Sequence, residues 1–89
     1  MEQEVKREEK RFVINNDGKE VYVEFDMRTN KMDLDHTYTH PELRGRGLAA
    51  QVVRAALEYA KENNLKVIPT CSYVRSFISK NEEYKELVK

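Results

Sequence analysis

Residues 41–49 read PELRGRGLA, and the hydrophobic pattern of the chain changes period across them. Before this stretch, apolar residues alternate with polar ones, which is typical of half-buried strands. After it, apolar residues recur at the spacing of a helix with one buried face. Pro41 ends the last strand, because proline has no backbone N–H to donate. The sequence therefore predicts a loop here that joins a strand to a helix.

Three short strands are predicted upstream of the loop, at residues 10–15, 20–27 and 32–39. Asn15-Asn16-Asp17-Gly18 separates the first two, and Arg28-Thr29-Asn30-Lys31 separates the last two. Gly and Asn tolerate the positive φ that tight turns require. Because strands joined by such short turns pair with each other, we expect an antiparallel meander.

A helix over residues 47–63 is predicted downstream of the loop. Its apolar stripe consists of Leu48, Val52, Val53, Ala56, Leu57 and Ala60. β-branched residues then predict a short strand at 65–69, which a right-handed helical crossover places parallel to the third strand. Ser72 is predicted to cap a second helix, and residues 82–88 to form a last helical turn or two. This order predicts a small α/β (α+β) fold, with an antiparallel meander followed by a β-α-β crossover and C-terminal helices.

Two glycines and two arginines give the loop its chemistry. Gly45 and Gly47 let the backbone approach an anion closely, and the helix that follows presents free N–H groups. Arg44 and Arg46 add local positive charge, so the loop is a candidate diphosphate cradle. A flexible glycine turn with two solvated arginines remains open. An RNA-binding segment is disfavoured, because the Arg-Gly motif occurs here as one short copy in a chain of zero net charge. A P-loop is disfavoured because no Gly-Lys-Ser/Thr follows.

The stretch 41–49 resembles the coenzyme A loop of the GNAT acetyltransferase superfamily. Its Arg/Gln-x-x-Gly-x-Gly/Ala signature is matched by Arg44, Gly47 and Ala49. More closely, the chain is similar to the minimal GNAT-like family. That family's Asp-His-Thr segment is matched by Asp35-His36-Thr37, and its cysteine–aromatic segment by Cys71-Ser72-Tyr73. Together with the tail Glu82-Glu83-Tyr84, the resemblance covers residues 10–88.

The resemblance implies a compact GNAT-like fold that binds acetyl-CoA, the acetylated form of coenzyme A. The backbone N–H groups of residues 44–49 would hold the pyrophosphate, and these residues are Arg44, Gly45, Arg46, Gly47, Leu48 and Ala49. The end of the third strand, near Tyr38 and Thr39, would pair with the pantetheine amides.

Cys71 and His36 are the candidate catalytic residues. Cys71 precedes a predicted helix, and a thiol at a helix N-terminus tends to a lowered pKa, which suits attack on a thioester. The resemblance implies a place near the acetyl group, while a small buried hydrophobe remains open. His36 could act as a general base near neutral pH. Period two puts it on the core face with Met32 and Leu34, unless a β-bulge of the kind found in GNAT folds re-aims it.

Four further residues are weaker candidates. Tyr73 and Tyr84 could donate a proton, although aromatic residues at helical spacing are more often core. Asp33 and Asp35 are expected on a solvated strand face. We expect no metal site, because no third ligand stands at a sensible spacing from the two aspartates.

The composition bounds the partners. The 89 residues predict one domain, with a charged, frayed N-terminus at 1–9 and a single GNAT-like N-acetyltransferase domain at 10–89. Sixteen basic and sixteen acidic residues cancel, so no global field draws the chain to nucleic acid or an anionic membrane. A single cysteine and the lack of a membrane-length apolar segment favour the cytoplasm. We expect a monomer or a weak homodimer.

The sequence thus predicts an N-acetyltransferase that moves an acetyl group from acetyl-CoA to a small-molecule or protein amine. A non-enzymatic acyl-CoA-binding module, acting as a sensor or carrier without a working base, remains open. A preference for basic acceptors would need an acidic patch, for which Asp26, Asp33 and Asp35 are the candidates.

Overall fold

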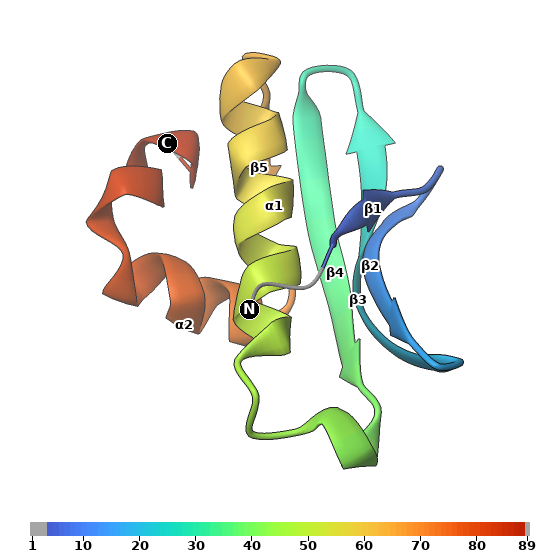
Figure 1. Ribbon diagram of the computed structural model, residues 1–89. Helices are drawn as coiled ribbons and strands as arrows, with labels where there is room; N and C mark the ends of the chain where they lie inside the picture. Colours follow the sequence, from blue (N-terminus) through green and yellow to red (C-terminus); the bar gives the residue numbers. More distant parts are fainter. Residues whose placement is uncertain (1–3, 89) are drawn as a thin grey trace.

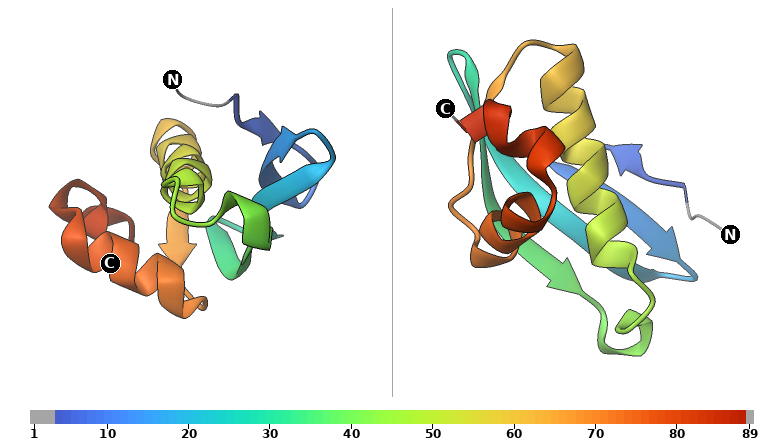
Figure 2. Two further views of the ribbon diagram at one scale, coloured as in Figure 1. Left: turned by 60° about the horizontal axis from the view of Figure 1, so that its bottom comes forward. Right: turned by 90° about the vertical axis from the view of Figure 1, so that its left-hand side faces the viewer.

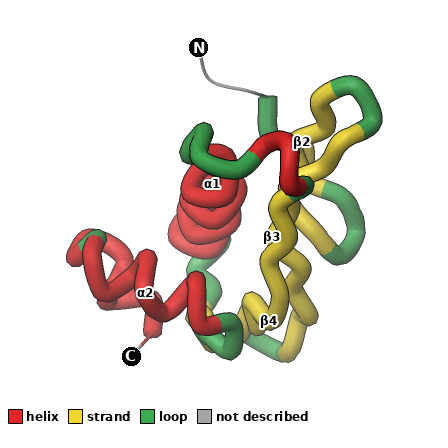
Figure 3. Tube along the Cα trace, turned by 90° about the horizontal axis from the view of Figure 1, so that it is seen from below, coloured by secondary structure: helices red, strands yellow, loops and turns green. Residues whose placement is uncertain are grey.

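The computed structural model describes residues 4–88 and contains one five-stranded sheet in the order β1-β2-β3-β4-β5. The first four strands are antiparallel neighbours, and β5 runs parallel to β4. The helical segments α1 (Leu48–Glu62), α2 (Ser72–Lys80) and η2 (Glu82–Val88) cover one face of this sheet (Figure 1, Figure 2 and Figure 3). Within the described residues the opposite face carries no helix, and we call it the bare face.

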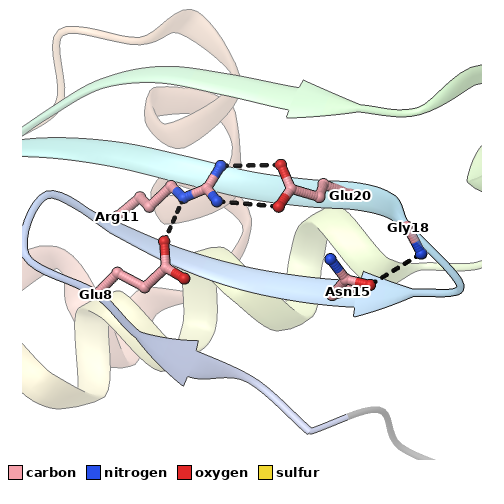
Figure 4. A network of polar contacts seen from close by, with 5 residues as sticks. All are labelled: Glu8, Arg11, Asn15, Gly18 and Glu20. Carbon is pink, nitrogen blue, oxygen red and sulfur yellow. Dashed lines mark hydrogen bonds and ion pairs between the residues drawn. The ribbon is translucent and has the colours of Figure 1, made fainter.

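The predicted meander is confirmed. Its strands are β2 Arg11–Asn16, β3 Lys19–Arg28 and β4 Lys31–Thr39. Two-residue turns join them, and in the first turn Asp17 and Gly18 adopt positive φ angles of 55° and 82°. The Asn15 side chain accepts a hydrogen bond of 3.0 Å from the Gly18 N–H (Figure 4). Turn chemistry of this kind fixes the register of the hairpin.

The crossover is confirmed as well. The elements after β4 are η1 Pro41–Leu43, α1 Leu48–Glu62, β5 Lys66–Ile68, α2 Ser72–Lys80 and η2 Glu82–Val88, where η denotes a 3₁₀ helix. All six residues of the predicted α1 stripe are at most 5% exposed. They pack on β2, β3, β4 and β5 and form the core between helix and sheet.

Tyr84 joins η2 to α1. Its side chain is fully buried, and its hydroxyl donates a hydrogen bond of 2.6 Å to Glu58 and accepts one of 3.1 Å from Arg54. Since a buried hydroxyl without partners is costly, this pairing fixes the C-terminal segment against the helix. Tyr84 is therefore a core residue, which is the alternative to the proton donor that the sequence analysis considered.

A β-bulge divides β4 into two halves. Phe25 of β3 pairs with Leu34, and the preceding Glu24 pairs with His36, so Asp35 has no partner across the ladder. An extra residue shifts the alternation of faces by one position. Leu34 faces the helices before the bulge, and Thr37 faces them after it.

The N-terminal stretch 1–9 was expected to be frayed, but Lys6–Arg7 are ordered as a strand. These two residues form the short strand β1, which pairs with Phe12 and Val13 of β2. Arg11 stabilises the connection, because its guanidinium contacts Glu8 at 2.6 Å and Glu20 at 2.9 Å (Figure 4). Residues 1–3 and 89 lie outside the described part of the chain.

Replacing Val53 by Asp tests the buried stripe. Val53 is fully buried in α1, so the carboxylate would stand unpaired in the core and cost about 3–5 kcal/mol of unfolding free energy. Urea denaturation followed by circular dichroism measures the loss. Glu62→Asp, at an exposed position of the same helix, is the control that should unfold like the parent. A Val53→Asp protein as stable as its parent would contradict the packing of α1 on the sheet.

Candidate functional site

The loop between β4 and α1 begins with η1. His40 precedes it and its Nδ1 accepts a hydrogen bond of 3.1 Å from the Glu42 N–H. The chain then turns through Gly45 and Gly47, both left-handed, with φ of 80° and 73°. An L-residue with a side chain is disfavoured in this conformation, which explains the two glycines.

α1 begins without a side-chain cap. Gly47 occupies the N-cap position, and no acidic residue lies in the first turn. The first N–H groups of a helix have no partner within the helix, and they carry the positive end of its dipole. An anion bound beside Leu48 and Ala49 would receive these hydrogen bonds. The loop therefore fits the diphosphate that the sequence led us to expect.

A pocket of about 190 Å³ lies at this helix end. It is lined by Thr39, Leu43, Arg44, Gly45, Gly47, Leu48, Ala49 and Tyr73. Six of the eight predicted cofactor-binding residues are thus brought together. Tyr73 joins them from α2, although the sequence had offered it only as a weak proton donor.

Two predicted cofactor-binding residues lie elsewhere. Tyr38 is 39% exposed, and its ring lies 5.4 Å from that of Tyr22 on the bare face. Arg46 lines a separate hollow with Lys19 and Glu42 on the other side of the loop. Neither side chain lines the pocket at the start of α1.

Cys71 lies where β4 and β5 separate. β5 pairs with β4 only from Lys31 to Asp33. The chain then turns, and the Cys71 N–H donates a hydrogen bond of 3.0 Å to the Leu34 carbonyl. The Arg75 guanidinium holds this turn by donating to the Pro69 and Thr70 carbonyls at 3.1 and 2.7 Å.

The Cys71 thiol lies against the helix-facing side of β4. Its Sγ is 3.6 Å from the Thr37 hydroxyl, and Thr39 of the pocket is two residues further along the same side. Two residues of strand span about 7 Å. Cys71, rather than the predicted Ser72, occupies the N-cap position of α2, which puts its sulfur at the N-terminal end of that helix.

The surroundings of Cys71 favour its thiolate. Burial is the largest single effect and raises the pKa of the thiol. The Thr37 hydroxyl and the backbone N–H groups of Val74, Tyr73 and Thr37 oppose it, and together they hold the pKa of Cys71 below its ordinary value. Cys71 is thus a partly buried thiol whose pKa lies below its ordinary value.

His36 is not beside Cys71. It pairs with Glu24 across the ladder, is exposed, and its ring lies 6.2 Å from that of Tyr22 on the bare face. The bulge at Asp35 is the reason, because it reverses the parity on which a core histidine was predicted. The structure therefore separates the two candidate catalytic residues onto opposite sides of β4.

Asp33 differs from its expected place on a solvated strand face. It is 8% exposed and accepts a hydrogen bond of 2.6 Å from the Thr70 hydroxyl, while Arg28 lies 3.4 Å away. Asp33 therefore helps to fix the turn that carries Cys71. Asp35 is exposed, as expected. Among residues 4–88, no group of three His, Cys, Asp or Glu could hold a metal ion.

Thr37 is the site residue that sequence reasoning missed. It stood inside the quoted Asp-His-Thr segment, but strict alternation from Leu34 places it away from the helices. Only the bulge turns it toward Cys71, and nothing in residues 31–39 marks where that bulge falls.

The comparisons with known proteins agree with this geometry. The family model for GCN5-related N-acetyl-transferase matches residues 11–87. The solution NMR structure of a GCN5-like protein from Staphylococcus aureus matches with a TM-score of 0.76 and 31% identity, covering 94% of this chain and 85% of that one. The fold is therefore GNAT-like.

Curated relatives match over a shorter region. Protein NATD1 from Homo sapiens and from Bos taurus is 38% identical over 50 residues, and that from Danio rerio is 36% identical over 50 residues. These matches cover 56% of this chain and 44% to 46% of the relatives. The aligned region is thus less than half the length of NATD1. Among the described helices, none has the length and apolar content needed to span a membrane.

Replacing Thr37 by Val tests the activation of Cys71. Loss of the hydroxyl should raise the pKa of the thiol, so the midpoint of the pH–rate profile for iodoacetamide alkylation should move upward. The rate near neutral pH should fall about two- to tenfold. Thr29→Val, in the exposed turn between β3 and β4, is the matched control. Identical profiles for both variants would mean that Thr37 does not act on the sulfur.

Proposed function

We propose a function from one premise: this chain belongs to the GCN5-related N-acetyltransferase family. Its reaction is the transfer of an acetyl group from acetyl-CoA to an amine. The observation that carries the proposal is the position of the Cys71 thiol relative to the N-terminus of α1. Cys71 contacts Thr37, and Thr39, two residues along β4, lines the pocket at that N-terminus. Both lie on the same side of β4, so one extended ligand can reach from Gly47 to Thr37.

The loop is the proposed anchor for the diphosphate of acetyl-CoA. The donors are the N–H groups around Gly45, Gly47 and Ala49, and the Arg44 side chain adds charge from the pocket wall. Tyr73 and Thr39 line the route from the loop toward Cys71. Acetyl-CoA supplies a thioester, whose carbonyl carbon is open to nucleophiles.

Cys71 is the proposed nucleophile. Its thiolate forms a bond to the acetyl carbon, and the coenzyme A thiolate leaves. The amine then attacks the acetyl-cysteine, the Cys71 thiolate departs, and the amine proton passes to water. The N–H groups and hydroxyl that favour the thiolate also make Cys71 a competent leaving group in the second step.

A non-enzymatic acyl-CoA-binding module is the second candidate. The observation in its favour is the position of His36, which lies on the bare face instead of beside Cys71. Such a module would use the same loop and pocket. Its Cys71 would pack as a small residue between Leu34 and α2.

Replacing Gly47 by Glu tests the loop as the cofactor site. A carboxylate at the helix N-cap would occupy the position of the diphosphate and repel it, so the affinity for coenzyme A should fall by at least about tenfold in titration calorimetry. Gly47→Ala is the control, because it imposes the same backbone strain without the charge. Equal affinities for the two variants would place the diphosphate elsewhere.

Replacing Cys71 by Ala separates the two candidate functions. An enzyme that works through Cys71 should lose at least about 100-fold in acetyl transfer while keeping its affinity for coenzyme A, because the loop supplies the binding energy. In the parent, acetyl-CoA should slow the alkylation of Cys71, and mass spectrometry should detect an acetylated cysteine. Undiminished turnover in Cys71→Ala would indicate direct attack by the amine. A parent that binds acetyl-CoA tightly but modifies no amine would favour the binding module.

A further inference from the structure

The bare face carries a group of aromatic side chains. Tyr22 of β3 lies 5.4 Å from Tyr38 and 6.2 Å from His36, measured between ring centroids. Tyr38 is 39% exposed. The helical segments α1, α2 and η2 lie on the other face of the sheet (Figure 3). The Arg11 guanidinium lies 4.9 Å from the centroid of the Tyr22 ring, so His36 and Tyr38 are the exposed rings of this group. Exposed aromatic rings on an uncovered sheet are a typical contact surface for a partner.

Carboxylates border these rings. A hollow of about 370 Å³ is lined by Lys10, Glu24, Phe25, Asp26 and Asp35. Three carboxylates and one ammonium give it a negative charge. Asp26 has Arg28 at 4.0 Å, but within the described residues neither Glu24 nor Asp35 forms an ion pair.

The carboxylates of the hollow repel one another. Burial, followed by the charges of Asp33, Glu24 and Asp26, raises the pKa of Asp35. A cation bound among these groups would relieve the repulsion. Aromatic faces also attract cations, because the ring quadrupole is negative above its plane. The two features of this face thus favour the same kind of ligand.

The loop pocket and the hollow carry opposite local charge. Arg44 lines the loop pocket on the helix-covered side, whereas Glu24 and Asp35 stand on the bare side. An anionic donor and a cationic acceptor would therefore be attracted to different faces.

The two faces meet at the free edge of β4. β5 accompanies β4 only as far as Asp33, so within the described residues no strand flanks the outer edge of β4 from Asp35 to Thr39. Cys71 lies at this edge, next to Thr37. A side chain that extends from the hollow around one strand edge would reach the thiol.

We propose that the bare face docks a cationic polypeptide segment, with His36 and Tyr38 as the aromatic contact and Glu24 and Asp35 as the charged one. As an assignment of the acceptor, it rests on the proposed acetyl transfer. The segment presents a lysine to Cys71 at the edge of β4. A polypeptide fits better than a small amine, because the surface is open and spread over two strands, whereas small ligands favour enclosed apolar pockets.

Fluorescence anisotropy with a labelled lysine–glycine repeat peptide tests the proposal, with a glutamate–glycine peptide as the comparison probe. The parent should bind only the lysine peptide, and more weakly as salt rises. The double variant Glu24→Gln/Asp35→Asn should weaken binding about three- to tenfold. Its matched control is Glu62→Gln/Glu86→Gln, which removes the same charge from exposed helical positions and should bind like the parent. Tyr38→Leu should also weaken binding.

Three outcomes would overturn the proposal. The first is no binding by the parent, and the second is an equal loss of affinity in the two double variants. The third is that spermidine displaces the labelled peptide at a much lower concentration than the unlabelled lysine peptide does. The last result would assign the face to a small polyamine. Coenzyme A titrations on the same proteins keep the two hypotheses apart. Glu24→Gln/Asp35→Asn should retain its affinity for coenzyme A. A parent that fails to bind coenzyme A would contradict the acetyl-transfer proposal. The peptide titration would still decide whether the bare face is a docking surface.

Discussion

β4 and β5 pair over only three residues, Lys31–Asp33 against Lys66–Ile68, and then separate. Backbone groups left by this separation need other partners. The Leu34 carbonyl accepts a hydrogen bond from the Cys71 N–H, and the Thr37 hydroxyl lies 3.6 Å from the Cys71 sulfur. The same separation opens the side of β4 along which Thr39 and the loop pocket lie. A short parallel ladder is thus the condition for having a site at all.

The bulge at Asp35 gives the two halves of β4 different tasks. Before it, Met32 and Leu34 are fully buried beneath the helices. After it, the threonines at 37 and 39 face the helices, and His36 and Tyr38 face the opposite side. Because of the one inserted residue, the first half of β4 contributes to the core. The second half presents two chemically distinct surfaces, one on each face of the sheet. The helix-facing surface meets a thiol and an anion-ready loop, and the outer surface is aromatic and acidic.

Regular features of the chain could be predicted, because they follow from local periodicity. The α1 stripe and the Asn15–Gly18 turn each depend on residues near one another in sequence. The parallel crossover follows from the helix that connects β4 to β5. The loop could be recognised by Gly45 and Gly47, whose positive φ angles need glycine. The faces of His36 and Thr37 could not, since parity depends on a bulge that only pairing with β3 reveals. Asp33 was misplaced because its partner, Thr70, is distant in sequence.

The parallel ladder also bears on how the chain folds. The hairpins of β2, β3 and β4 close over two-residue turns, whereas β5 reaches β4 only after α1 has crossed the sheet. Contacts between distant residues form late, because the entropy of closing the intervening loop must be lost first. Cys71 gains its neighbours Leu34 and Thr37 only when β5 has docked. A partly folded chain would therefore hold a meander but no activated thiol, and alkylation of Cys71 during refolding would report the final step of assembly.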